Sequence, residues 1–191
     1  MKAIAYAALA AVIGTGAWAE PVQYDLDPSH SQVIFSYKHL GFSTTFGMFS
    51  GFEGEILFDE GAPENSSVNV SMPISSMFTG WEAREAHFLG GQEFFDAAKN
   101  DLVSFASTGI EVTGDSTAVI TGDLTMNGIT KSVALDAVLN QKGQNPLAQK
   151  EWIGFDATTT LLRSDFGVGA FAPNVSDEVE VRISVEAGAA G

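Results

Sequence analysis

Alternation between apolar and polar residues is the feature that most limits what this chain can fold into. In the segment 31–39, SQVIFSYKH, Val33, Phe35 and Tyr37 fall on one face. His39 ends the segment on that same face. A two-residue period is that of a β-strand with one buried and one wet face. Such strands are typical of antiparallel sheets, because parallel sheets are normally covered on both faces.

The same period returns seven more times along the chain. The alternating segments are 51–59, 67–74, 102–108, 117–126, 132–140, 152–161 and 178–186. Turn-forming residues separate several of them, at 59–61, 114–115, 127–128 and 142–143. About eight strands in one medium-sized domain predict an all-β fold, either a sandwich or a closed barrel.

One region departs from the alternation. Residues 79–98, TGWEAREAHFLGGQEFFDAA, place Trp81, Glu85 and Phe88 at helical spacing until Gly90-Gly91 interrupts the pattern. We therefore expect a short helical insertion around 79–98, with a second short turn through 93–95.

The first 19 residues, MKAIAYAALAAVIGTGAWA, match a secretory signal. A single cation at Lys2 precedes an apolar run, and Ala17-Trp18-Ala19 gives a small-x-small cleavage pattern. The alternative is a membrane anchor, but the run 3–13 is short against the roughly 20 residues that span a bilayer. No later segment is long and apolar enough to cross a membrane. We expect cleavage after residue 19 and a single domain over 20–191.

Composition removes several classes of function. The chain has no cysteine, which excludes disulfides, thiolate metal sites and cysteine nucleophiles, and which suits a bacterial periplasm. The net charge is −15, and −16 without Lys2. Such a protein repels nucleic acid and anionic membrane surfaces, so no nucleic-acid partner is expected.

Phenylalanine and glycine are concentrated in the first half of the chain. The stretch 38–54, KHLGFSTTFGMFSGFEG, holds four of each, and eleven of the 14 phenylalanines lie between Phe35 and Phe105. Barrels of about eight strands can hold a small ligand, so these rings could line a cavity that the glycines leave room for. An ordinary aromatic core is the alternative that composition leaves open.

The sequence contains few residues that could act in catalysis or in metal binding. The three histidines, His30, His39 and His87, form no local pair at metal-ligand spacing. They could grip the polar head of an amphipathic ligand, act as a base or metal ligand, or be held by structural hydrogen bonds. Arg163, which precedes Asp165, suggests a structural ion pair or a contact to the same pocket. The sequence contains no Gly-x-Ser-x-Gly elbow and no phosphate-binding loop between strand and helix.

Several stretches resemble the motifs of one known family in order and spacing. They are YDLDPSHSQVIFSYKHLGFSTTFGMFSGFEGEILFD near the N-terminus, REAH followed by EFFDAA, VSFAST, GDLTMNGITKSVALD, and IGFDATTTLLRSDFGV. Over about residues 24–185 the chain is similar to the YceI-like proteins. The resemblance implies an extended, lipocalin-like antiparallel β-barrel in the periplasm. It also implies that the barrel binds a polyisoprenoid or similar long lipid, related in some members to isoprenoid quinones, without being an enzyme.

The function expected from residues and resemblance together is that of a periplasmic carrier of an isoprenoid-like lipid, without cofactor or metal, as a monomer or homodimer. The predicted wall comprises Phe35, Phe42, Phe46, Phe52, Phe88, Phe94, Phe95 and Phe105. The predicted head-group contacts are His39, Arg84 and His87. Two alternatives stay open: an enzyme that uses His39 or His87 as a base on an amphipathic substrate, and a periplasmic stress or interaction module with a solid core.

Overall fold

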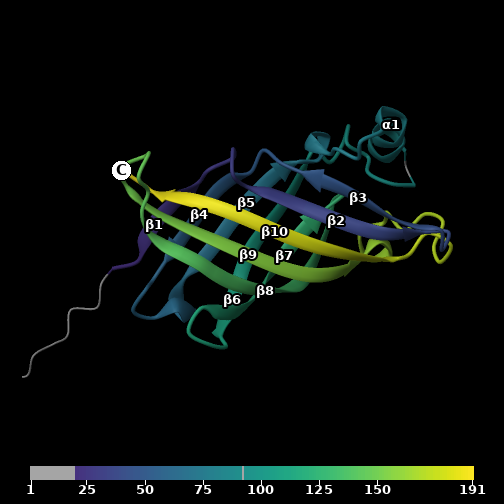
Figure 1. Ribbon diagram of the computed structural model, residues 1–191. Coiled ribbons are helices and arrows are strands. Elements are labelled where there is room, and N and C mark those ends of the chain that lie inside the picture. The colour runs from purple at the N-terminus through teal and green to yellow at the C-terminus, as the bar shows by residue number, and fades with distance from the viewer. Residues whose placement is uncertain (1–19, 92) are drawn as a thin grey trace, which may run out of the picture.

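The strands of this chain pair in a ring. The structure, a computed structural model, describes residues 20–91 and 93–191, and its strands form one antiparallel sheet that closes through pairing of the first strand with the last (Figure 1). The expected signal peptide, residues 1–19, lies outside the described residues. The strands are β1 Val22–Leu26, β2 Gln32–His39, β3 Ser43–Phe49, β4 Glu53–Phe58, β5 Ser67–Pro73, β6 Leu102–Val112, β7 Thr117–Met126, β8 Ile129–Gln144, β9 Glu151–Leu162 and β10 Glu178–Ala189.

Ten strands fill eight positions of a barrel. β1 and β2 lie in line along β10, since Leu26 pairs with Ala187 and Gln32 pairs with Ser184. β3 pairs with β2, and β4 pairs with β1, so these two also share one position. The expectation of an antiparallel, lipocalin-like barrel of about eight strands is therefore confirmed, and the sandwich is excluded.

Two interruptions divide the shared positions. Between β1 and β2 the chain stays bound to β10, because the Asp27 amide donates to the Glu186 carbonyl at 2.8 Å. Between β3 and β4 it turns at Gly51, whose φ of 71° lies in the left-handed region that favours glycine. The strands 22–26 and 43–49 were not predicted, because the first has only five residues and the second carries apolar residues on both faces, Phe46 and Met48 on one and Phe49 on the other.

The turn expected at 142–143 is wrong. β8 runs on to Gln144, and the chain reverses over residues 145–150 instead. A register shift between Leu139 and Gln141 places an extra residue in the strand. Such a bulge changes which residues face inward, so the alternation that ends near residue 140 does not mark the end of the strand.

The helical insertion is present and shorter than expected. After β5 the chain leaves the sheet through the 3₁₀ turn η2 Ile74–Ser76, and helix α1 spans Glu82–Gly90. The helix ends at the glycine pair, and the chain bends at 93–94, both as expected; a further turn at 97–99 follows in place of more helix. Figure 1 places α1 at one end of the barrel, the end that also carries the loop 163–177, which joins β9 to β10. We call this end the mouth.

Asn127 and Arg163 hold the mouth together. Asn127, in the turn between β7 and β8, donates to the Phe166 carbonyl at 3.2 Å and accepts from the Asp96 amide at 3.2 Å. It thereby joins the helical insertion to the 3₁₀ turn η3 Arg163–Phe166. The Arg163 guanidinium donates to four backbone carbonyls of the loop 163–177, at distances of 2.8–3.1 Å. Arg163 is therefore structural, and its hydrogen bonds go to the main chain rather than to an acid.

No helix within the described residues is long and apolar enough to cross a membrane.

Candidate ligand-binding cavity

The barrel encloses a cavity of about 820 Å³. Alternate residues of each strand supply its wall: β8 contributes Val133, Leu135 and Ala137, and β10 contributes Val179 and Val181. The volume lies in the upper part of the range of about 300–1,000 Å³ that is usual for small-molecule sites. Most of the lining is aliphatic or aromatic, so the space suits an apolar guest.

Two glycines leave room for phenylalanine rings that lie along the wall. Gly47 of β3 is directly opposite Phe35 of β2, and a Cβ at Gly47 would overlap that ring. Gly122 of β7 lies beneath the ring of Phe105 in the same way. Without these glycines the rings would have to turn into the cavity. This explains why the chain combines bulky rings with glycine: the glycines keep the interior hollow.

The two glycines are expected to respond differently to alanine. A Cβ at Gly122 would lie 2.6 Å from the backbone oxygen of Ala106, and the strand backbone would have to shift to make room. Gly122→Ala should therefore lower the free energy of unfolding by about 1–3 kcal/mol. The three atoms nearest to a Cβ at Gly47 all belong to the Phe35 ring, so Gly47→Ala should keep its stability and push that ring into the cavity. Urea denaturation measures the first effect, and the largest apolar ligand retained measures the second. Equal destabilisation of the two variants would contradict this assignment.

An aromatic cluster covers the mouth. Phe88 of α1 contacts Tyr37 of β2, with ring centroids 6.2 Å apart, and Phe94, at 4.9 Å. Phe95 meets Phe49 of β3 edge-on at 6.3 Å. These rings tie the helical insertion to the strands by apolar contact, so side chains of a separate segment border this end of the cavity.

Nine of the eleven residues predicted to contact a ligand line this cavity: Phe35, His39, Phe52, Arg84, His87, Phe88, Phe94, Phe95 and Phe105. Phe42 and Phe46 do not. Phe42 lies in the exposed turn between β2 and β3, and Phe46 points outward from β3, where it pairs with Ser36. We therefore leave these two out of the proposed wall.

The predicted polar residues gather at the mouth without forming one bonded group. The Arg84 guanidinium carbon lies 5.5 Å from the centre of the Trp81 ring, and Arg84 donates to the Thr79 carbonyl at 3.3 Å. His87 packs edge-on against Phe94, with centroids 5.0 Å apart. His39 reaches the same opening from the end of β2. Each presents a polar atom at the edge of an apolar space.

The opposite end of the cavity carries polar residues that sequence reasoning missed. The Lys142 ammonium donates to Glu60 at 3.1 Å and to Glu151 at 3.2 Å, and the Tyr24 hydroxyl donates to Glu151. Burial, followed by the neighbouring Glu151 carboxylate, raises the pKa of Tyr24. The bulge in β8 turns Lys142 inward, and no periodic pattern would have shown that. The amine is held by two acids, so this end of the lining carries an ion-pair cluster rather than an unpaired charge.

A family model described as the YceI-like domain matches residues 24–187. The chain belongs to the YceI-like family. A relative called UPF0312 protein from Pseudomonas savastanoi is 35% identical over 187 residues, which are 97% of this chain and 96% of the relative. Another of that name from Ectopseudomonas mendocina is 37% identical over 176 residues, 92% of this chain and 91% of the relative.

Solved structures agree with this family assignment. BcnA of Burkholderia cenocepacia superimposes with a TM-score of 0.76 at 25% identity, over 85% of this chain and 99% of BcnA. The YceI protein of Campylobacter jejuni gives 0.72 at 30% identity, over 81% and 90%. A polyisoprenoid binding domain from Saccharophagus degradans gives 0.68 at 13% identity, over 88% and 99%, which shows a common fold.

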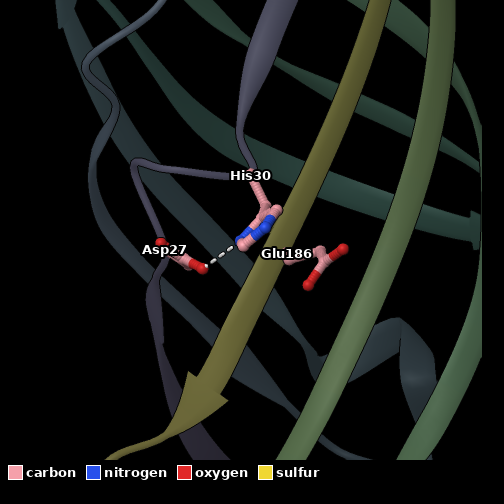
Figure 2. Close-up of side chains that lie close together, drawn as sticks. All are labelled: Asp27, His30 and Glu186. Atoms are coloured by element: carbon pink, nitrogen blue, oxygen red, sulfur yellow. Dashed lines mark hydrogen bonds and ion pairs between the residues drawn. The ribbon is translucent and has the colours of Figure 1, made fainter. Parts of the chain in front are cut away.

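The third histidine of this YceI-like chain lies outside the cavity. Figure 2 shows His30 bonded to Asp27, with Glu186 of β10 beside them. One nitrogen and two carboxylate oxygens lie within 4.8 Å of one another, close enough for a cation. Both acids already accept hydrogen bonds, Asp27 from Ser29 and His30, and Glu186 from the Trp152 indole at 2.7 Å. We therefore interpret the cluster as structural: its hydrogen bonds hold the chain in place where it passes from β1 to β2, which we call the β1–β2 corner.

This corner makes a pH-dependent contribution to stability. The hydrogen bond to Asp27 raises the pKa of His30 above its ordinary 6.5. Burial alone would raise the pKa of Asp27, but hydrogen bonds from His30 and Ser29 outweigh it and lower the pKa below 3.8. The ion pair therefore stabilises the fold between those two values. That stabilisation is lost as the pH rises through the raised pKa of His30, or falls through the lowered pKa of Asp27.

His30→Gln is expected to destabilise the protein near pH 5–6 and to have little effect well above the pKa of His30. Chemical denaturation across pH measures the difference, and an NMR titration of the His30 ring gives its pKa. Asp27→Asn should bring that pKa back towards its ordinary value. A His30 that titrates at or below 6.5 in the unmodified protein would contradict the ion pair.

Proposed function

We propose that this YceI-like barrel binds a long apolar or amphipathic lipid of the polyisoprenoid type, isoprenoid quinones included, and carries it through the periplasm. The observation that carries the proposal is the cavity of about 820 Å³ with its mostly apolar lining. Burying a CH₂ group away from water gains about 0.8 kcal/mol, so a long chain of such groups has a strong drive to enter.

Two further facts support the ligand class. A protein with the same fold, from Saccharophagus degradans, is named for polyisoprenoid binding. At the mouth, His39, Arg84 and His87 offer polar atoms beside the apolar wall, an arrangement that suits a molecule with a polar head and an apolar tail. The predicted signal in residues 1–19 and the absence of cysteine from the sequence favour the periplasm.

The alternatives lack a comparable observation. A solid-core interaction module is disfavoured by the cavity itself. An enzyme with a histidine base would need the ring oriented by an acid, as in most activated histidines. Within residues 20–91 and 93–191 the acid-bonded histidine is His30, which lies outside the cavity. We therefore propose a binding protein without catalytic activity.

Native mass spectrometry of the protein purified from its own periplasm tests the proposal. A discrete adduct is expected, and solvent extraction should release a molecule with the five-carbon mass spacing of isoprenoids. Addition of such a lipid to protein stripped by extraction and refolding should restore the adduct with one-to-one stoichiometry. Stripped, folded protein that takes up no isoprenoid lipid would refute the proposal.

A further inference from the structure

The exposed aromatic side chains of this protein lie at one end of the barrel. Within the described residues they are Phe42, Phe46, Phe78, Trp81 and Phe171. Phe42 is 90% exposed, and the other four are between 57% and 61% exposed. They come from the β2–β3 hairpin, the start of the helical insertion and the loop 163–177, which Figure 1 places together at the mouth. We call these five residues the aromatic rim.

Part of the rim is continuous over the outer surface. Met48 of β3 pairs with Phe78, and it also pairs with Ile34 of β2. Paired residues on neighbouring strands point to the same face, and Phe46 lies two positions from Met48, so it shares that face. Phe46, Phe78 and Ile34 therefore form one apolar area on the outside of the hairpin, next to the exposed turn that bears Phe42.

The rim also continues into the cavity. Trp81 and Phe171 are exposed, and both line the cavity at its mouth. The Phe171 ring lies 6.1 Å from Phe94, which is buried in the aromatic cluster. An apolar path therefore leads from the interior over these two residues to the outer surface. At the opposite end of the barrel the Lys142 ion pairs lie beside the lining instead.

We propose that the aromatic rim docks on the surface of a bilayer of zwitterionic phospholipid, so that the mouth opens onto the lipid. Tryptophan is enriched at the boundary between head groups and acyl chains, and phenylalanine is common on the apolar faces of segments that lie in this boundary. Exposed apolar areas around a site usually mark contact with a membrane or another protein. The inference rests on the proposed function in one respect, since a lipid cargo gives the mouth a reason to face a membrane.

Charge favours this occupant over two others. The chain carries −15, so a second copy and an anionic lipid surface both repel it, whereas a zwitterionic surface has no net charge to oppose it. A second copy is the main competitor, because β3 pairs with β2 on one side and, on the other, makes only the bridge at Met48 within the described residues. Such pairing would bring two strongly acidic molecules together and would close both mouths.

Flotation with phosphatidylcholine vesicles tests the docking. The protein is expected to float with the vesicles, and to do so equally at about 0.1 M and about 1 M salt, because the Debye length falls from about 10 Å to about 3 Å while apolar insertion is unaffected. Phe42→Ser and Phe46→Ser should each lower partitioning about tenfold, as expected for the loss of one buried aromatic ring. Neither residue lines the cavity, so both variants should keep their lipid adduct in native mass spectrometry.

Leu147→Ser is the matched control. Leu147 is 92% exposed in the β8–β9 turn, at the end that carries the C-terminus, so its replacement should leave flotation unchanged (Figure 1). Flotation that requires phosphatidylglycerol in the vesicles and is lost at high salt would overturn the proposal. An equal loss of flotation in Phe42→Ser, Phe46→Ser and Leu147→Ser would also overturn it. Protein that stays in solution as a dimer, which Phe42→Ser dissociates in light scattering, would show that the rim joins two copies. If the protein binds vesicles but takes up no isoprenoid lipid, the proposed function fails while the docking proposal stands.

Discussion

Phe35→Asp is expected to lower the affinity of the barrel for a long apolar ligand by about 100-fold or more. The Phe35 ring lies against the wall over Gly47, with the Phe49 ring 5.4 Å away. Removing a phenylalanine contact costs about 1.5–3 kcal/mol, and every 1.4 kcal/mol is a factor of ten in the dissociation constant. The new carboxylate would also have to lose its water when the ligand fills the cavity, which costs more than the lost contact.

Ile34→Asp is the matched control for this prediction. Ile34 is the neighbouring residue of the same strand and points outward, so the substitution places the same charge on the solvent-exposed side of the wall. It should leave ligand affinity in solution unchanged. Titration of stripped protein with an isoprenoid lipid, followed by native mass spectrometry, measures both variants, and circular dichroism confirms that they fold. A folded Phe35→Asp protein that binds as tightly as the unmodified one would show that the wall is assigned wrongly.

The inner faces of the long strands could be predicted because alternation is a local property. Val33, Phe35, Tyr37 and His39 were placed on one face from spacing alone, and all four line the cavity. What spacing cannot give is the face that a short, isolated strand presents. Phe46 and Phe49 of β3 differ by an odd number of residues and so point to opposite sides. Only pairing with β2 shows that Phe46 is the outer one.

Features that depend on irregular backbone geometry could not be predicted from the sequence. Phe42 was expected in the wall because of its neighbours, but Leu40 and Gly41 adopt positive φ and form a tight turn that carries it into solvent. Lys142 was expected in a turn, whereas the bulge in β8 keeps it in the strand and turns it inward. A bulge adds one residue and inverts the inside-outside pattern beyond it, and no residue type marks its position uniquely.

Arg163→Ala is expected to have the largest effect on stability, a loss of about 3 kcal/mol in the free energy of unfolding. The guanidinium donates to the carbonyls of Val168, Ala170, Val175 and Ser176, all in the loop 163–177. Hydrogen bonds from a charged donor contribute about 1.5–3 kcal/mol, and carbonyls left without a partner add a further cost. For a protein of this size the melting temperature should fall by roughly 6–12 °C.

Arg163→Lys separates geometry from charge. Burial lowers the pKa of Arg163 from its ordinary value, and Asp177 and Tyr37 oppose this, so a cation is tolerated here. Lysine keeps the charge but lacks the planar fork that reaches several carbonyls at once, so it should recover less than half of the loss. Arg182→Ala, on the exposed face of β10, should change the melting temperature by little. The same loop carries Phe171 and Val175 of the cavity lining, so Arg163→Ala should also weaken ligand binding. If the Arg163→Lys variant has the same melting temperature as the unmodified protein, the charge alone holds the loop in place. The four hydrogen bonds would then not determine the shape of the mouth.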